Sequence, residues 1–391
     1  MAESVVRGLD GGPRVPPPLS LYIHLPWCVR KCPYCDFNSH AAQSLPEAAY
    51  IDALLADLER ALPDIWGRKV HTVFFGGGTP SLFSPDGIDR ILTGVRALTP
   101  LAPGAEITLE ANPGTVETAK FKGFRAAGVN RVSLGVQSFD ARHLQALGRI
   151  HDAAEAARAA ELAATHFETF NLDLMFALPG QTLAQALADV EAALAFAPPH
   201  LSAYHLTLEP NTPFGHTAPA GLPDEDLAAD MQLAIEERLG AAGLQHYETS
   251  AYARPGHRSR HNLNYWQFGD YLGIGAGAHS KLSFHDRIVR EMRTKHPQQY
   301  MEAVKAGAHV ADTRMLTRGD LPFEFMMNAL RLTEGVPAAL FETRTGLPLP
   351  ACRSALDRAR AQGLLEPDPT QLKPTRRGQH FLNDLLELFL P

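Results

Sequence analysis

The sequence predicts an α/β protein in which a partial (β/α)6 barrel is followed by a small, mostly helical, winged-helix-like C-terminal domain. Short apolar runs alternate with amphipathic helical patterns from residue 19 to residue 208, which indicates βαβ units and a parallel sheet. Six such units follow one another without a break, and right-handed crossovers curl such a series into an open or partial barrel. From about residue 310 the pattern becomes helical, which predicts a separate unit.

The barrel elements begin after a proline-rich start. Residues 1–18 have no hydrophobic period and are predicted to form a flexible arm. The predicted strands are residues 19–25, 72–75, 106–110, 131–136, 169–176 and 201–208. The predicted helices are residues 45–62, 85–98, 117–127, 141–147 with 152–164, and 183–197. A Rossmann-like sheet is the alternative, and the missing G-x-G-x-x-G run after the first strand disfavours it.

The second half of the chain changes in character. It is predicted to contain a linker at 219–223, a helix at 227–242, a strand at 246–253 and a glycine-rich segment at 269–280. Further predicted helices are 322–333, 336–345 and 349–362, followed by a short hairpin within 363–374 and a last helix at 378–390. We therefore divide the chain into an arm (1–18), a barrel with an extension (19–285) and a C-terminal helical domain (286–391).

Composition limits the classes of partner. The chain has 36 Lys and Arg against 43 Asp and Glu, so its net charge of −7 gives no electrostatic basis for nucleic-acid binding. No stretch approaches the ~20 apolar residues of a membrane helix. The first residues include Glu3 and Asp10 and lack the apolar segment of a secretion signal. We expect a cytoplasmic protein with no integral membrane segment.

Three of the four cysteines follow the first predicted strand. Cys28, Cys32 and Cys35 have the spacing C-x3-C-x2-C, and clustered cysteines in a protein without an export signal indicate a metal or redox site. Thiolates are the usual ligands of iron–sulfur clusters, and three of them would leave one iron of a [4Fe–4S] cluster open for a ligand. The alternative is a structural zinc site with His24 or His40 as the fourth ligand.

A glycine segment closes the second predicted strand. Its residues are Gly76-Gly77-Gly78-Thr79-Pro80, at the carboxyl end of the strand, where barrel active sites form. Glycines at this place let a ligand reach the backbone N–H and C=O groups. Together with the cysteine loop, this segment favours an iron–sulfur site over zinc.

These motifs resemble those of the radical SAM (S-adenosylmethionine) superfamily, and specifically its coproporphyrinogen-oxidase-like branch. The run from Tyr22 through Cys35 carries the resemblance. Supporting runs lie at residues 75–80, 110–113, 135–139, 147–149 and 173–175, and the resemblance is clear over residues 19–285. It implies a partial six-unit TIM barrel of the radical SAM type, a [4Fe–4S] cluster, bound SAM and an electron donor.

The resemblance also implies which residues bind SAM. Tyr22, Gly77 and Glu110 are similar to residues that bind the cluster-ligated SAM. The residues similar to those of a second SAM site in the oxidase are Tyr34, Gly78, Thr79, Gln137, Arg149, Asp173 and Thr207. Glu110 could accept hydrogen bonds from an amino group or a ribose, and Arg149 could pair with a carboxylate. A surface salt bridge is the alternative role for Arg149.

Two features distinguish the branches of the family. The pattern typical of the oxidases has a fourth cysteine two residues after the third. This chain has Phe37 at that position. The run His261-Asn262-Leu263-Asn264-Tyr265-Trp266 resembles the H-N-x-x-Y-W run of the haem chaperones of the superfamily. The resemblance implies that His261 contacts haem, with Tyr265 and Trp266 packed on the macrocycle. A loop histidine among core aromatics is the alternative, and His24, His205 and His279 are other candidate ligands.

Three functions remain open on the sequence. The first is a haem chaperone with a SAM-ligated cluster that passes haem to an acceptor, such as a respiratory protein. The second is an oxygen-independent coproporphyrinogen III dehydrogenase, a radical decarboxylase of porphyrin biosynthesis. The third is a structural zinc or iron–sulfur protein. Phe37 and the 261–266 run favour the first, and the intact Gly76–Pro80 segment with Glu110 and Arg149 disfavours the third. No catalytic residue is assigned.

Overall fold

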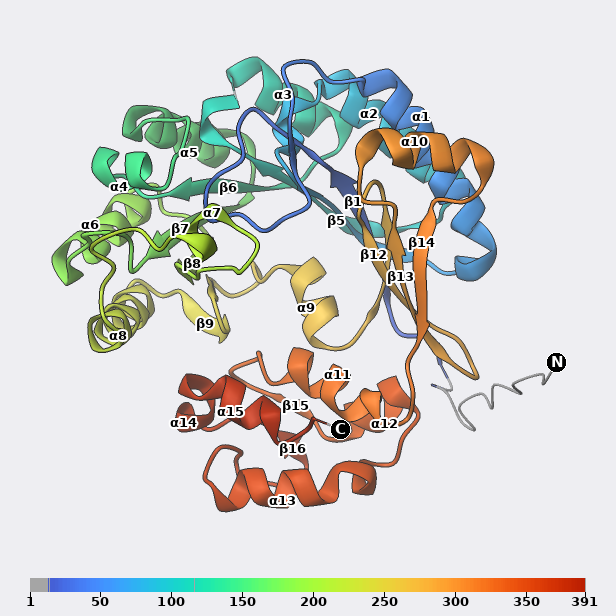
Figure 1. Ribbon diagram of the computed structural model, residues 1–391, viewed down its shortest axis with the longest axis vertical. Coiled ribbons are helices and arrows are strands. Elements are labelled where there is room, and N and C mark those ends of the chain that lie inside the picture. Colours follow the sequence, from blue (N-terminus) through green and yellow to red (C-terminus); the bar gives the residue numbers. More distant parts are fainter. Residues whose placement is uncertain (1–12, 14, 116, 391) are drawn as a thin grey trace.

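The computed structural model describes residues 13, 15–115 and 117–390, so most of the predicted arm (1–18) lies outside the described residues. Within them the main body is a curved sheet of 12 strands, and its first six parallel strands form the partial barrel (Figure 1). These are β1 (Leu19–Leu25), β4 (Val70–Gly77), β5 (Leu101–Ala111), β6 (Arg131–Gln137), β7 (Thr169–Phe176) and β8 (His200–His205). Each of them pairs in parallel with the next. The predicted α/β barrel is confirmed.

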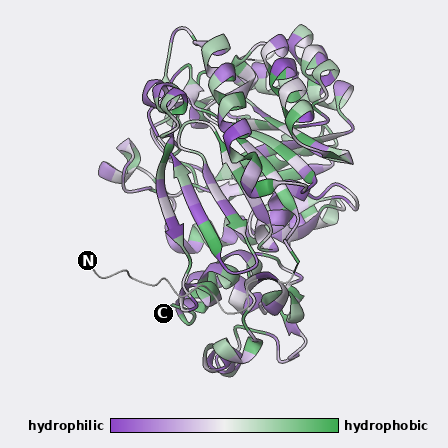
Figure 2. Cartoon of the chain, turned by 90° about the vertical axis from the view of Figure 1, so that its right-hand side faces the viewer, coloured by the Kyte–Doolittle hydropathy of each residue, from purple (hydrophilic) through white to green (hydrophobic). Residues whose placement is uncertain are grey.

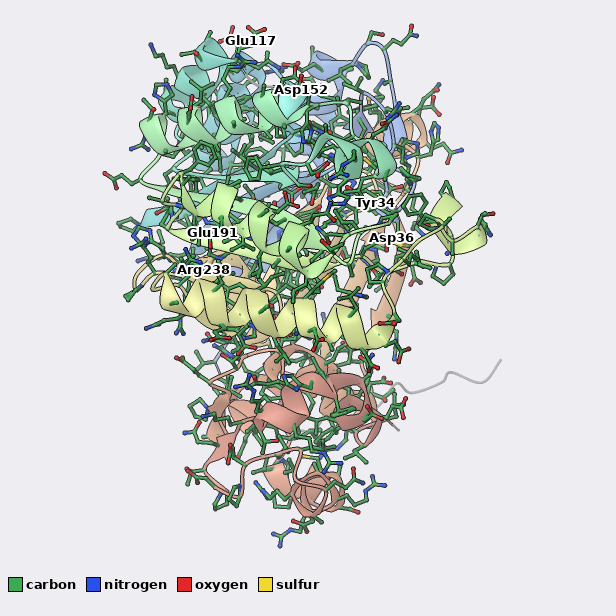
Figure 3. All side chains as sticks on the ribbon, turned by 90° about the vertical axis from the view of Figure 1, so that its left-hand side faces the viewer. Tyr34, Asp36, Glu117, Asp152, Glu191 and Arg238 are labelled. Atoms are coloured by element: carbon green, nitrogen blue, oxygen red, sulfur yellow. The ribbon has the colours of Figure 1, made fainter. Side chains whose placement is uncertain are left out.

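Helices cover the outer face of these strands. They are α1 (Glu47–Ala61), α2 (Pro85–Leu98), α3 (Thr118–Ala127), α4 (Ala141–Ala146), α5 (Ala153–His166), α6 (Leu183–Leu194) and α8 (Glu225–Ala241). Capping side chains fix where several of them begin: Asp152 and Glu155 form a capping box at α5, and Thr182 and Gln185 form one at α6. On the outside, the side chains of Glu191 on α6 and Arg238 on α8 form an ion pair that joins the two helices (Figure 3).

The two faces of the barrel strands differ in chemistry. The outward face is apolar and packs under the helices, with Ile23, Val73, Leu109, Val132 and Leu172 all buried. The inward face carries polar side chains instead, and these positions alternate with the apolar ones as strand geometry requires. The inward polar residues are Thr72, Glu110, Arg131, Ser133, Asn171, Asp173, His200 and Ser202. Figure 2 shows hydrophobic residues concentrated in the central strands and hydrophilic ones spread over the covering helices.

The sheet extends beyond the barrel at both edges. On one side β10 (Ala251–Ala253) pairs antiparallel with β8, and β9 (Gln245–Glu248) pairs antiparallel with β10. On the other side the added strands are β11 (Asp270–Ile274), β12 (His279–Ser283), β13 (Ile288–Arg293) and β14 (Val310–Met315). The expected division at 285–286 falls between the paired strands β12 and β13, and the sheet continues to the end of β14 at Met315.

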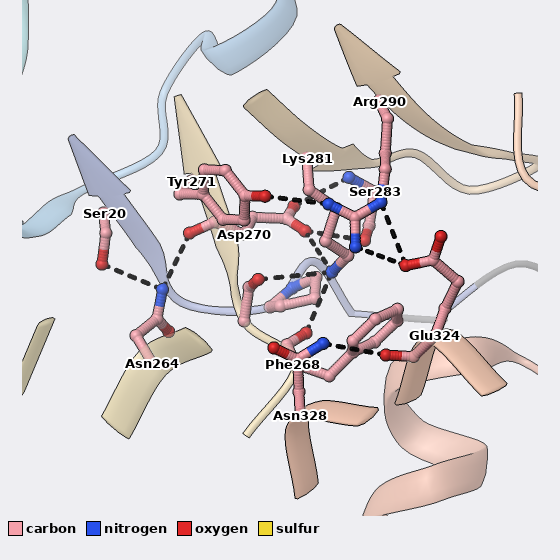
Figure 4. Close-up of polar contacts among 12 residues, drawn as sticks. Ser20, Asn264, Phe268, Asp270, Tyr271, Lys281, Ser283, Arg290, Glu324 and Asn328 are labelled. Carbon is pink, nitrogen blue, oxygen red and sulfur yellow. Dashed lines mark hydrogen bonds and ion pairs between the residues drawn. The ribbon is translucent and has the colours of Figure 1, made fainter. Parts of the chain in front are cut away.

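Two buried ionic networks hold this extension on the barrel. Asp270 at the start of β11 accepts from Lys281 (3.0 Å) and the Ser283 hydroxyl (2.7 Å), and Arg68 lies 2.9 Å away (Figure 4). A second network is centred on Asp57 of α1. Its partners are Arg293 at 3.0 Å, His309 at 2.9 Å and the Tyr300 hydroxyl at 2.8 Å, on β13 and around α10 (Pro297–Ala306).

The C-terminal residues form a mostly helical unit, and its core also includes Tyr247, Phe268 and Ile288 from the preceding segment. Its elements are α11 (Asp320–Ala329), β15 (Val336–Pro337), α12 (Ala339–Thr345), α13 (Arg353–Ala361), β16 (Gln371–Leu372), α14 (Arg376–His380) and α15 (Leu382–Glu387). Phe325, Phe341, Leu356 and Leu385 are buried in this core. The predicted hairpin is present as a bridge between Leu365 and Pro374, while the predicted last helix is divided into α14 and α15 at Phe381.

One short helix lies between the barrel and the C-terminal unit. This helix, α9 (Arg260–Trp266), carries the His–Asn–x–x–Tyr–Trp run and faces the inner side of the sheet (Figure 1). Ser259 caps its N-terminus by accepting from the Asn262 N–H. Leu263 and Trp266 pack against the core of the C-terminal unit. Among the described helices, none combines the length and apolar character that crossing a bilayer requires.

Candidate cofactor cavity

A cavity of about 630 Å³ lies on the inner side of the barrel sheet. We call its two ends the loop end and the α9 end. The loop end, at the carboxyl ends of the strands, is lined by Cys28, Cys32, Tyr34, Cys35, Gly78, Thr79, Gln137 and Arg149. The α9 end, at the amino ends of the strands, is lined by Phe74, Arg131, His200, His261, Tyr265 and Trp266. Glu110 and Asp173 line the stretch between them, so the sequence-predicted residues meet in one continuous space.

The three cysteines are free thiols, and two of them accept weak hydrogen bonds from the cavity wall. The Thr79 hydroxyl lies 3.5 Å from Cys28 Sγ, and Arg149 Nη1 lies 3.5 Å from Cys32 Sγ. Burial raises the pKa of the Cys28 and Cys35 thiols. Because metals bind the thiolate, loading the loop with a metal would release protons.

The two histidines expected as a fourth zinc ligand differ in their hydrogen bonding. His24 uses both ring nitrogens: Nδ1 lies 3.0 Å from the Tyr22 hydroxyl and Nε2 lies 2.8 Å from the Asn38 carbonyl oxygen. The buried Nε2 of His40 has no hydrogen-bond partner among the described residues. An iron–sulfur cluster takes its thiolates at separate irons, and three cysteines on one loop fit it.

The glycine segment is required by the packing of the chain itself. Gly77 has φ +116°, and a Cβ there would lie 2.6 Å from the His24 ring. A Cβ on Gly78 would overlap the Trp27 carbonyl oxygen. The N–H groups of Gly78 and Thr79 donate to the carbonyls of Leu25 and Trp27, at 2.9 and 2.7 Å. This segment therefore fixes the strand that leads into the cysteine loop.

Two carboxyl groups face the middle of the cavity. Burial, with a smaller contribution from the charge of Asp173, raises the pKa of Glu110 to about 8. Burial also raises the pKa of Asp173, whose oxygens accept from Asn171 (2.8 Å) and Ser133 (3.0 Å). Near neutral pH Glu110 is therefore largely protonated, and a cationic ligand beside it would favour its ionised form.

Arg149 links the cysteine loop to the barrel strands. Its Nη2 donates to the Gly135 carbonyl at 2.8 Å, its Nη1 lies 3.4 Å from the Tyr34 hydroxyl, and its buried Nε has no partner (loop residue Tyr34 is labelled in Figure 3). Nearby, Gln137 has φ +69° at a register shift between β6 and β7. Such left-handed backbone in a residue other than glycine is costly and is concentrated at binding sites.

One predicted SAM residue lies apart from the others. Thr207 follows the end of β8, is exposed and does not line the cavity. Its hydroxyl donates to Glu209 at 3.1 Å. The structure therefore brings together all the sequence-predicted site residues except Thr207.

His261 is buried and hydrogen-bonded through both ring nitrogens. The Thr72 hydroxyl donates to Ser20, so it accepts from His261 Nδ1, at 2.7 Å. This leaves Nε2 as the acceptor of the Tyr265 hydroxyl, at 3.2 Å. Burial lowers the pKa of His261 to about 3, so the ring is neutral. Nε2 is thus the nitrogen with a lone pair directed toward Tyr265.

Trp266 joins the cavity to the C-terminal unit. The guanidinium of Arg331 lies over its ring, 4.3 Å from the centroid. The indole Nε1 is buried and has no hydrogen-bond partner. The indole therefore offers an unused donor at the α9 end.

Several cavity residues were missed by the sequence analysis. Arg131, Ser133, Asn171 and Ser202 lie within segments predicted as apolar strands, and His200 lies just before the predicted strand 201–208. They occur in pairs two residues apart, which places both members of a pair on one face of a strand. That alternation was the signal that could have identified them.

A parallel barrel sheet with three cysteines on one loop at its carboxyl edge is the arrangement of a radical SAM protein. The family profile described as "Radical SAM superfamily" matches residues 22–193, and the profile described as "HemN C-terminal domain" matches residues 316–381. The superfamily predicted from the motifs is confirmed.

Relatives match nearly the whole chain. "Heme chaperone HemW" of Escherichia coli (strain K12) is 52% identical over 377 residues, which is 96% of this chain and 98% of the relative. The protein of the same name from Mycobacterium tuberculosis (strain ATCC 25618 / H37Rv) is 38% identical and covers 93% of this chain and 92% of its own length. This chain belongs to the HemW family of radical SAM proteins.

A further relative is named for a radical SAM domain, and a solved structure shares the fold. "Radical S-adenosyl methionine domain-containing protein 1, mitochondrial" of Bos taurus is 36% identical over 96% of this chain and 89% of its own length. The solved structure of coproporphyrinogen III oxidase (HemN) from Escherichia coli superposes with a TM-score of 0.82 over 96% of this chain and 90% of that chain, at 23% identity. At this identity the likeness concerns the fold, and the oxidase function is not favoured.

Proposed function

We propose that this protein binds haem at the α9 end of the cavity and transfers it to an acceptor protein. The observation that carries the proposal is one cavity that joins the cysteine loop to His261, Tyr265 and Trp266, in a chain whose relatives are named haem chaperones. The flat aromatic surfaces at this end suit a macrocycle, and area removed from water would supply much of the affinity. His261 Nε2 is the proposed iron ligand.

We further propose a [4Fe–4S] cluster on Cys28, Cys32 and Cys35, with SAM beside it. The cluster and SAM together supply one-electron chemistry when an external electron donor reduces them. Glu110 and Asp173 would meet the cationic and hydroxyl groups of SAM, and Arg149 would meet its carboxylate. The other proposed SAM contacts are Tyr22, Tyr34, Gly77, Gly78, Thr79 and Gln137, with Thr207 outside the cavity. Free thiols are kept reduced in the cytoplasm, which is the compartment we propose.

The test is anaerobic reconstitution followed by two assays on the same sample. We expect about four irons and four sulfides per chain, a Soret band that saturates near one haem per chain, and no conversion of coproporphyrinogen III with SAM and a low-potential reductant. Cys32→Ala should lose the cluster and keep haem binding. Multiple turnovers of coproporphyrinogen would contradict the chaperone function, and zinc without labile sulfide would contradict the cluster.

A further inference from the structure

Arg131 is a buried cation in the α9 end that has no ion pair or side-chain hydrogen bond in the described part of the chain, although its charge partly offsets the effect of burial on the pKa of Asp173. It is the first residue of β6 and is 3% exposed. Among the residues that the structure describes, its guanidinium forms no ion pair and no hydrogen bond, and its Nε is a buried donor without an acceptor. A buried guanidinium with neither is destabilising, and a bound anion would compensate for its charge.

The neighbouring polar groups are already engaged with one another. Asp173 accepts from Asn171 and Ser133, and the Asn171 amide oxygen accepts from His200 Nδ1 at 2.6 Å. Glu106 accepts the backbone N–H groups of Arg260 and His261, at 3.1 and 3.0 Å, at the start of α9. Neither carboxyl group comes within ion-pair distance of Arg131.

A second unused donor lies beside Arg131. Thr108 on β5 is its register partner, and the Thr108 hydroxyl is fully buried without a hydrogen-bond partner. The adjacent cavity wall is aromatic, with Phe74, Tyr265 and Trp266. The α9 end thus combines an apolar, planar surface with one concentrated positive charge.

We propose that Arg131 binds a carboxylate of the ligand in the α9 end, namely a propionate of haem; this assignment rests on the proposed function. A guanidinium binds a carboxylate through two parallel hydrogen bonds, which fixes orientation as well as position. Haem presents two propionates on one edge of an otherwise apolar ring, and this chemistry matches the wall around Arg131. SAM also carries a carboxylate, but Arg149 lies at the loop end to meet it.

The experiment compares haem with haem dimethyl ester, in which both carboxylates are esterified. Each would be titrated into the full-length protein, and the ratio of the two Kd values would be measured from the Soret band. For the wild type we expect haem to bind tighter than the ester by on the order of tenfold to a hundredfold. In Arg131→Gln the ratio should fall to near one, whereas Arg131→Lys should keep part of it.

A stability measurement separates a ligand-binding role from a structural one. Because Arg131 is unpaired, Arg131→Met should leave the Tm of the ligand-free protein unchanged or raise it. Arg290→Met is the matched control, since Arg290 is paired with Glu324 and should lower the Tm when replaced.

Each contrary result has a defined meaning. A wild type that binds no haem would overturn the proposed function along with this assignment. Haem binding with the same ratio in Arg131→Gln would overturn only the role of Arg131. Weaker SAM binding in Arg131→Gln with an unchanged haem ratio would assign Arg131 to SAM and overturn the propionate site. A large fall in Tm for Arg131→Met would make Arg131 a structural residue.

Discussion

Burial sets the ionisation of the residues that line the cavity. It raises the pKa of Glu110 to about 8 and lowers that of His261 to about 3, so both side chains are largely neutral at physiological pH. A neutral imidazole is able to donate its lone pair to a metal, and a protonated carboxyl is able to donate a hydrogen bond. Ligands that enter the cavity therefore determine which of these groups become charged.

SAM binding should depend on pH through Glu110. The sulfonium cation of SAM favours ionised Glu110, whose pKa is about 8 in the ligand-free protein, so binding below this pH must release a proton. Apparent affinity should rise by up to about tenfold per pH unit from pH 6 towards 8 and then level off. SAM titrations of the reconstituted protein at a series of pH values measure this. Glu110→Gln is the control and should show a flatter profile; an equally flat wild-type profile would contradict the role of Glu110.

Tyr265→Phe should increase iron ligation by His261. The substitution removes the tyrosine hydroxyl, which donates a hydrogen bond to His261 Nε2 at 3.2 Å, and retains the aromatic ring. The freed lone pair should raise the proportion of histidine-ligated haem, seen as a shift of the Soret band and of the spin state. His261→Ala should remove that signal in either background. If Tyr265→Phe leaves the spectrum at wild-type values while haem still binds, another side chain ligates the iron.

At the level of elements, long-range ion pairs fasten the extension strands to the barrel. Asp57 on α1 and Arg293 on β13 are 236 positions apart, and both are almost completely buried. The Arg293 nitrogen and the Asp57 oxygen lie 3.0 Å apart, and in this buried environment each charge depends strongly on the other for compensation. The extension is thereby part of the same sheet and positions α9 beside the inner face of the barrel.

Asp57→Asn should destabilise the protein strongly. It removes one of the two carboxylates that pair with the buried Arg293 and leaves Glu291, at 2.8 Å, as the other, so we expect a loss of up to about 3 kcal/mol, the lower end of the cost of breaking a buried pair. Because the pKa of Asp57 is lowered on folding, its contribution is complete above the ordinary carboxyl pKa and is lost as pH falls below it. Urea unfolding at neutral pH measures the effect. Asp52→Asn, which breaks an exposed pair with Arg90 on α2, should cost less than about 1 kcal/mol; equal losses would contradict this account.

The sequence predicted local elements well and long-range contacts poorly. Periodicity located the six barrel strands and their helices, because each element carries its own apolar face. Cysteine spacing located Cys28, Cys32 and Cys35. Periodicity could not place β13 in the sheet, since its pairing with β12 and the Asp57–Arg293 contact depend on residues distant in the chain. Arg131 was missed because it and Ser133 stand at the start of a run that is otherwise apolar.

At the scale of the whole molecule, α9 connects the cavity with the C-terminal unit. One face of α9 carries His261 into the cavity, while Leu263 and Trp266 pack against the core that contains Phe325 of α11. A ligand that rests against α9 therefore contacts an element shared by both parts of the chain. The C-terminal unit can respond to the contents of the cavity without lining it.

Haem should slow backbone hydrogen exchange in both α9 and α11. Ordering α9 restrains the Trp266 contact with the C-terminal core, so protection should extend to the neighbouring helix. Hydrogen–deuterium exchange with and without haem measures it, and α13 serves as an internal reference in which we expect little change. Protection limited to α9 would show that the helix does not transmit the effect.

The two ends of the cavity lie in one continuous space, so ligands bound at both ends could influence each other. If a ligand at the loop end changes the affinity of the α9 end by some factor, a ligand at the α9 end must change the affinity of the loop end by the same factor. For a carrier this reciprocity couples loading to release. A loop-end ligand that weakens haem binding would favour delivery to the acceptor, and departure of haem would in turn tighten the hold on that ligand until the next haem arrives.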